Sequence, residues 1–220
     1  MSLLTFSGWG QPADALSHAL QLKHAQLFDY SHYAGMDPAI DALHGTHAEH
    51  VVAWSLGGQL ALHAIARGAL STDRLTLIGV PFQFVQTDAY ADAMDRFTFE
   101  TFCDNYARDP ARTATRFQGL LAKGDSRFKQ VMAAFRNHPQ IDDAARWLPW
   151  LHALDHAPVA AIDLRHTPAT TIIHGSEDGI VPVAQAHALA AALPHATVEM
   201  WQGVAHAPHL HAPERLRAVL

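Results

Sequence analysis

The hydrophobic pattern of this chain alternates between short apolar runs and segments with helical spacing. Mainly apolar runs of strand length occupy residues 3–6, 26–30, 49–54, 75–80, 169–174 and 196–201. Helical spacing occupies residues 13–21, 38–43, 59–67 and 183–193. Buried strands separated by helices are typical of a mostly parallel sheet that helices cover on both faces, so we expect an α/β fold.

The alternation stops between residues 88 and 154. This segment contains helical stretches rich in aromatic residues, and no stretch of it has the pattern of a strand. We expect an all-helical lid insertion at 88–154 and one α/β core built from 1–87 and 155–220. Because sites in such folds lie at the carboxyl ends of the strands, an insertion at this point would roof the site.

The apolar run at 49–54 leads directly into a serine and then into a helical segment. Ala53-Trp54-Ser55-Leu56-Gly57 has the layout of a nucleophile elbow, a sharp strand-to-helix turn that exposes a serine hydroxyl. The turn requires small residues two positions before and after the serine. Gly57 meets this requirement, and Ala53 stands where glycine is more usual. The alternative is an ordinary strand–loop–helix crossover with an incidental serine.

Two later loops carry the residue types that would complete a catalytic triad. One loop contains Glu177 and Asp178, and we prefer Asp178 because it directly precedes the glycine that leads into the next helix. His206 follows the last strand. A serine hydroxyl needs an imidazole to take its proton and a carboxylate to orient that imidazole. The order Ser55, Asp178, His206, each after its own strand, is that of the α/β-hydrolase fold.

Two backbone N–H groups are candidates for an oxyanion hole. Leu56 would begin the elbow helix, where its N–H has no intrahelical acceptor. Trp9 lies in a glycine-rich loop after the first strand, and its indole could also form a wall of the pocket. The alternative for Trp9 is a tight turn with a packing tryptophan.

Length and composition limit the remaining possibilities. At 220 residues we expect one domain, and the formal charge of −6 argues against nucleic-acid binding. Cys103 is the single cysteine, which suits a reducing compartment. The chain shows no leader pattern and no apolar run of membrane-spanning length. We expect a cytoplasmic monomer that does not bind membranes.

The 17 histidines invite a metal hypothesis. His44, His47 and His50 are spaced by three, and His209 and His211 follow His206, but neither group has a carboxylate or thiol that would complete a ligand set. We interpret the first three, together with His209 and His211, as surface residues. We expect no metal and no cofactor.

The combined motifs resemble a known family, the biotin-pathway esterases that remove the methyl group from pimeloyl-acyl-carrier-protein methyl ester. The resemblance rests on residues 6–10, 28–30, 52–57, 112–113, 116–117, 120–121, 124, 162–165, 178–179, 181–182 and 205–208. It implies an α/β-hydrolase fold, here without the first strands of the common fold because residues 3–6 must already precede the oxyanion loop.

The resemblance also implies roles for particular residues. It makes Ser55, Asp178 and His206 the triad, with the amides of Trp9 and Leu56 as the oxyanion hole. The expected substrate contacts are Trp9, Phe82, Phe117, Leu120 and Leu121. The expected docking residues for an acidic acyl carrier protein are Arg112, Arg116, Arg127 and Lys129, although charged residues on a helix are usually only solvated.

Two other functions remain open. A general short-chain carboxylesterase or thioesterase would use the same triad on other substrates. A non-catalytic binding protein would use only the fold, because a fold by itself does not determine function.

Overall fold

The computed structural model describes residues 2–137 and 143–220. Its described residues contain a six-stranded, fully parallel sheet with the strand order β2-β1-β3-β4-β5-β6. The strands are β1 (Leu3–Phe6), β2 (Gln26–Leu27), β3 (Thr46–Trp54), β4 (Leu70–Ile78), β5 (Ala169–Gly175) and β6 (Ala196–Trp201). The expected α/β fold is therefore present.

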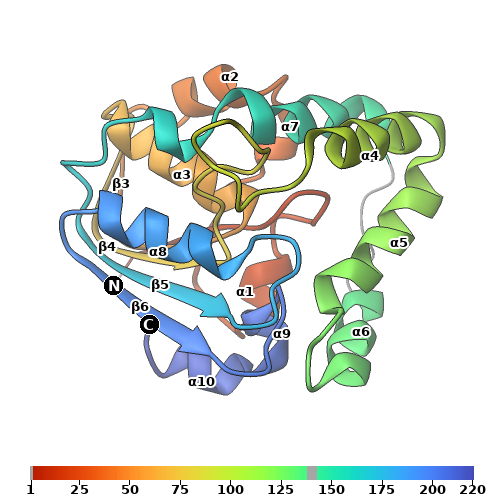
Figure 1. The fold of residues 1–220 in the computed structure, drawn as a ribbon. Coiled ribbons are helices and arrows are strands. Elements are labelled where there is room, and N and C mark those ends of the chain that lie inside the picture. Colours follow the sequence, from red (N-terminus) through yellow and green to blue (C-terminus); the bar gives the residue numbers. More distant parts are fainter. Residues whose placement is uncertain (1, 138–142) are drawn as a thin grey trace.

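Helices cover both faces of the sheet. On one face lie α2 (Met36–Asp41), α3 (Leu56–Ala66) and α8 (Val183–Ala192), and on the other lie α1 (Ala15–Ala19), α9 (Pro208–His211) and α10 (Pro213–Arg217) (Figure 1). The helix α3 is buried along almost its whole length. A helix that is apolar all round belongs in the interior, which explains why α3 can hold the end of the elbow rigidly.

The described residues between β4 and β5 form helices and loops without a strand of the sheet. The helices are α4 (Arg96–Arg108), α5 (Pro110–Ala122), α6 (Phe128–Asn137) and α7 (Ala144–His156). Aspartates cap three of them, because Asp95, Asp109 and Asp143 each accept a hydrogen bond from a first-turn amide. The limits 88 and 154 of the lid stay a prediction.

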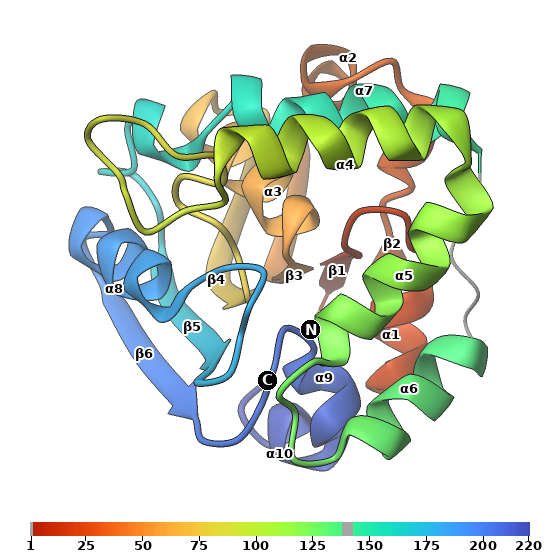
Figure 2. The ribbon, with the colours of Figure 1, turned by 45° about the vertical axis from the view of Figure 1, so that its right-hand side comes forward.

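The lid helices lie above and beside the carboxyl edge of the sheet. In Figure 1, α4 and α7 run across the top of the molecule, and α5 and α6 descend on the side towards which β5 and β6 point. Figure 2 shows α6 next to α9 and α1. None of the described helices is both long and apolar enough to span a membrane.

One predicted strand is wrong in part. The run at 26–30 forms a strand only over Gln26–Leu27 and then enters the 3₁₀ helix η1 (Tyr30–His32). Asp29 causes the change, because its side chain accepts a hydrogen bond from the backbone N–H of Ser31 and so forms a turn. A second 3₁₀ helix, η2 (Val159–Ala161), follows the lid.

Candidate active site

Ser55 lies at a strained turn between β3 and α3. Its backbone has φ 52° and ψ −124°, a conformation that is rare for a residue with a side chain. A Cβ atom at Gly57 would lie 2.3 Å from the backbone oxygen of Ser7. A Cβ atom at Gly58 would lie 2.2 Å from a methyl group of Val80. The two glycines therefore allow α3 to pack close enough to the sheet for this turn.

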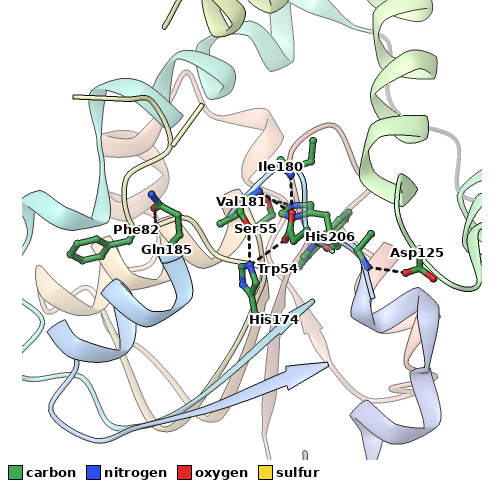
Figure 3. Close-up of polar contacts among 11 residues, drawn as sticks. Trp54, Ser55, Phe82, Asp125, His174, Ile180, Val181, Gln185 and His206 are labelled. Atoms are coloured by element: carbon green, nitrogen blue, oxygen red, sulfur yellow. Dashed lines mark hydrogen bonds and ion pairs between the residues drawn. The ribbon is translucent and has the colours of Figure 1, made fainter. Parts of the chain in front are cut away.

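His206 lies within hydrogen-bond distance of both other expected triad residues, Ser55 and Asp178, and Figure 3 shows it beside Ser55. His206 Nε2 is 3.0 Å from Ser55 Oγ, and His206 Nδ1 is 2.7 Å from Asp178 Oδ2. The side chains of Asp178 and His206 are almost completely buried. The geometry is that of a serine hydroxyl paired with a base that a carboxylate orients. The catalytic role of the three residues stays a prediction.

Asp178 is held in place by both of its carboxylate oxygens. While Oδ2 faces His206, Oδ1 accepts hydrogen bonds from the backbone N–H groups of Ile180 and Val181, both at 2.9 Å. Burial raises the pKa of Asp178, but the charge and hydrogen bond of His206 outweigh burial and hold that pKa below its ordinary value. The alternative acid, Glu177, is exposed and its Oε1 accepts from the neighbouring Ser176 hydroxyl.

The backbone of His206 is fixed from two sides. The Trp54 indole donates to the His206 carbonyl at 3.0 Å, and the His206 N–H donates to the carbonyl of Leu121, in the last turn of the lid helix α5, at 3.1 Å. Gly79 has φ +54°, and a Cβ atom there would lie 3.2 Å from the His206 ring. The lid and the elbow therefore both determine where this imidazole lies.

A second imidazole, which the sequence pattern did not single out, lies beside Asp178. His174, in β5, is fully buried, and its Nε2 lies 2.8 Å from the Val181 carbonyl and 3.5 Å from Asp178 Oδ2. Burial lowers the pKa of His174 although Asp178 raises it. His174 is thus neutral and donates to Val181. A histidine directly after the apolar pair Ile172-Ile173, near the end of β5, was the available signal.

The two candidate oxyanion donors follow neighbouring strands. Leu56 is the first residue of α3, so its N–H has no intrahelical acceptor. Trp9 follows β1, which pairs with β3, and its indole donates to the Trp147 carbonyl at 3.0 Å. Both residues therefore lie at the carboxyl edge of adjacent strands, next to Ser55. Their role as oxyanion donors stays a prediction.

An apolar cavity, open in part to solvent, adjoins Ser55 and His206. Among the described residues that line it, only His206 can carry a charge. The expected contacts Trp9, Phe117, Leu120 and Leu121 are in its wall. The sequence did not suggest the other lining residues, which are Trp54, Phe84, Met94, Thr98, Phe102, Leu151, Leu154 and Ile180.

Phe82 is a correction, because it does not line this cavity. Its backbone N–H donates to Gln185 Oε1 at 3.0 Å, and its ring packs against Tyr90. Figure 3 shows Phe82 and Gln185 together, away from Ser55 and His206. Phe84, two residues later, takes the expected place in the cavity wall.

Three of the histidines interpreted as surface residues are buried, so that interpretation is wrong for them. The His209 ring packs on Trp54 with centroids 4.3 Å apart. His211 Nδ1 lies 2.8 Å from Asp125 Oδ1. His50 Nε2 lies 2.9 Å from the Thr76 hydroxyl. Each of these imidazoles packs in the interior beside elements distant in sequence, which the local pattern does not report.

His44 and His47 are exposed, as expected. In the part of the chain that the structure describes, no three His, Cys, Asp or Glu side chains gather as possible metal ligands.

The basic residues expected to dock a carrier protein lie on or next to two lid helices. Arg112 and Arg116 are exposed on α5, and Lys129 is exposed on α6. Arg127 is also exposed but donates from Nη1 to the His211 carbonyl at 3.0 Å. Arg127 therefore has a structural contact, whatever else it binds.

A parallel sheet with a serine at the elbow after β3, an acid after β5 and a histidine after β6 defines the class of protein. The profile described as the alpha/beta hydrolase family matches residues 3–219. The chain belongs to the α/β-hydrolase family. An esterase from Exiguobacterium antarcticum has the same fold, with a TM-score of 0.78 at 14% identity over 100% of this chain and 90% of that one.

Within this family, the chain is similar to curated proteins whose names give either an ester hydrolysis or biotin biosynthesis. It is 36% identical over 173 residues to the pimeloyl-[acyl-carrier protein] methyl ester esterase of Aromatoleum aromaticum, covering 74% of this chain and 69% of that protein. It is 32% identical over 185 residues to the biotin biosynthesis bifunctional protein BioHC of Teredinibacter turnerae, covering 77% of this chain and only 32% of that protein. These findings confirm the resemblance to the biotin-pathway esterases.

Proposed function

We propose that this chain is a serine carboxylesterase that hydrolyses the methyl ester of pimeloyl-acyl-carrier-protein. The observation that carries the proposal is the hydrogen-bonded series Ser55–His206–Asp178 at the wall of an apolar cavity. The names of the similar proteins supply the substrate.

The reaction follows from the positions of the three side chains. Ser55 Oγ would attack the ester carbonyl while His206 Nε2 takes the hydroxyl proton, and His206 would then give that proton to the departing methoxide, which leaves as methanol. A water molecule would attack the acyl-enzyme, with His206 again as base. The acid would leave and the Ser55 hydroxyl would be restored. Asp178 would hold the imidazole tautomer and stabilise the imidazolium.

The negative oxygen of each tetrahedral intermediate would lie against the N–H groups of Leu56 and Trp9. Two backbone donors that are already oriented stabilise developing charge without reorganisation, and one such donor is typically worth about 3 kcal/mol. The strained Ser55 turn supports this arrangement, since in a nucleophile elbow the N–H of the residue after the serine is one of the oxyanion donors.

The cavity suits the acyl part of the proposed substrate. Its aliphatic and aromatic wall would bury a methylene chain, and each buried methylene contributes roughly 0.8 kcal/mol. Exposed Arg112, Arg116 and Lys129 lie on the lid helices that carry Phe117, Leu120 and Leu121 or follow them. An acidic carrier protein bound to these cations would deliver its acyl chain to the nearby cavity wall.

Two experiments test this proposal. Hydrolysis of p-nitrophenyl butyrate should be abolished in Ser55→Ala, and retention of that activity would contradict the triad. A biotin-requiring strain that lacks its own methyl ester esterase should grow without biotin when it expresses the wild-type chain and not when it expresses Ser55→Ala.

A general short-chain carboxylesterase is the second candidate. The observation in its favour is that the described lining residues other than His206 are uncharged, so none of them would select one acyl chain by charge. Growth failure of the complemented strain, together with efficient hydrolysis of simple esters, would favour this second function over the first.

A further inference from the structure

The link between the lid helices α5 and α6 is bonded to the loop that carries His206. The link comprises residues 123–127, and its Asp125 has a fully buried side chain. Asp125 Oδ2 accepts from the Ala205 N–H at 3.0 Å, directly before His206 in the sequence. Figure 3 shows this contact on the lid side of the site. A buried carboxylate is costly unless its oxygens are satisfied, so its partners matter.

The other oxygen of Asp125 has two further donors. Oδ1 accepts from the Arg127 N–H at 2.7 Å and from His211 Nδ1–H at 2.8 Å. His211 belongs to α9, which follows the His206 loop. The carboxylate therefore joins three segments: the lid link, residue 205 and α9.

Additional contacts connect the lid link to the His206 loop and to α9. Ser126 N–H donates to the Gly203 carbonyl at 2.8 Å, and Arg127 Nη1 donates to the His211 carbonyl at 3.0 Å. Just before the link, the His206 N–H donates to the carbonyl of Leu121 in the last turn of α5. Residues 203–206 are thus bonded to the lid at three backbone positions. Among the described contacts of these positions, the Asp125 carboxylate is the only buried charged group.

We propose that Asp125 is a positioning residue for His206, fixing the 203–206 loop so that the imidazole faces both Ser55 and Asp178. This end of the lid is then a fixed part of the catalytic framework. The inference rests on the proposed esterase function and extends it to a residue far from the triad in sequence.

The chemistry of Asp125 makes a sharp test possible. Both of its oxygens accept from backbone N–H groups, which can only donate. In Asp125→Asn the amide NH₂ would have to face either Ala205 N–H or Arg127 N–H, so an isosteric change must break one of these bonds. Asp109 is a matched control, because it accepts only a first-turn amide on α5 among its described side-chain bonds, and asparagine caps a helix equally well.

The experiment compares p-nitrophenyl butyrate hydrolysis by wild type, Asp125→Asn and Asp109→Asn at a temperature where each is folded by circular dichroism. We expect kcat to fall by about 10- to 100-fold in Asp125→Asn with KM changed by less than about threefold, because misplacing a base affects the chemical step. Asp109→Asn should stay within about twofold of wild type. An unchanged kcat in folded Asp125→Asn, or an equal loss in Asp109→Asn, would overturn the proposal.

Two further measurements keep the test decisive. If Asp125→Asn does not fold, His211→Ala replaces it, since this variant removes one donor to Asp125 and leaves both backbone donors paired. An unchanged kcat in His211→Ala overturns the proposal. A loss of kcat of about threefold or more supports it. If the wild type hydrolyses no ester, the proposed function fails, and proton NMR decides the inference alone. The low-field proton of the His206–Asp178 hydrogen bond should be present in wild type and Asp109→Asn and lost in Asp125→Asn.

Discussion

Individual residues at the elbow tolerate almost no added volume, and Gly57 shows this most directly. In Gly57→Ala the new methyl group would lie 2.3 Å from a backbone oxygen, which cannot rotate away as a side chain can. We expect the free energy of unfolding to fall by at least about 2 kcal/mol, measured by urea denaturation.

Gly119→Ala is the matched control for that change. Gly119 lies within α5, and a Cβ atom there would meet nothing within 4 Å. Because alanine is the better helix former, this variant should gain about 0.5–1 kcal/mol. Equal stability of the two variants would show that close packing at the elbow is not what requires Gly57.

His209 should make stability depend on pH. Burial, with a contribution from the charge of His206, lowers the pKa of His209 to about 3. In the unfolded chain its pKa is about 6.5, so below that pH only the unfolded state takes up this proton. The contribution of neutral His209 to the free energy of unfolding is therefore fully present above about pH 6.5 and is lost as the pH falls towards 3.

The size of this effect can be measured with one variant. When the pH is lowered from 7 to 5, His209 should reduce the free energy of unfolding by about 2 kcal/mol. His209→Leu, which has no proton to bind, should lose correspondingly less stability over this range in denaturant titrations at the two pH values. The same pH dependence in both proteins would contradict the prediction.

At the scale of elements, the segment after β4 divides its aromatic side chains between two places. Phe84 lines the cavity, whereas Phe82 packs on Tyr90. Phe84→Ala should enlarge the cavity and raise the kcat/KM ratio for p-nitrophenyl octanoate over butyrate by about threefold or more, because additional methylenes can then be buried. Phe82→Ala, the same chemical change, should leave the ratio unchanged while lowering stability.

The strands and the meeting of Ser55, Asp178 and His206 could be predicted because they depend on local patterns. A strand, a serine with a small residue two positions to either side, and a helix follow one another in a single stretch, and the acid and the histidine each follow their own strand. Asp125 could not be predicted in the same way, since its partners Ala205 and His211 are far from it in sequence. The contacts of His174 with Val181 and Asp178 depend on how the loop after β5 turns. Phe82 was wrongly placed because a loop lacks the periodicity that tells which side chains point inward.

The whole molecule has a net charge of −6, yet its lid presents exposed cations. Arg112→Glu with Arg116→Glu should lower kcat/KM for the carrier-linked ester by about tenfold or more, since an acidic partner would meet like charge. Hydrolysis of p-nitrophenyl butyrate by the same variant is the control and should be unchanged. The wild-type rate with the carrier-linked ester should also fall with added salt, and a salt-independent rate would contradict electrostatic docking.

Among the described residues of the cavity wall, His206 alone can ionise, and this affects how the reaction ends. A neutral ester can enter this apolar space, but its hydrolysis creates an anion there, and no lysine or arginine is among the described residues that line it. An unpaired carboxylate is far more stable in water than in such surroundings, so the product should depart as soon as it ionises. The free acid should therefore inhibit the enzyme at neutral pH much less than a non-hydrolysable analogue of the ester does.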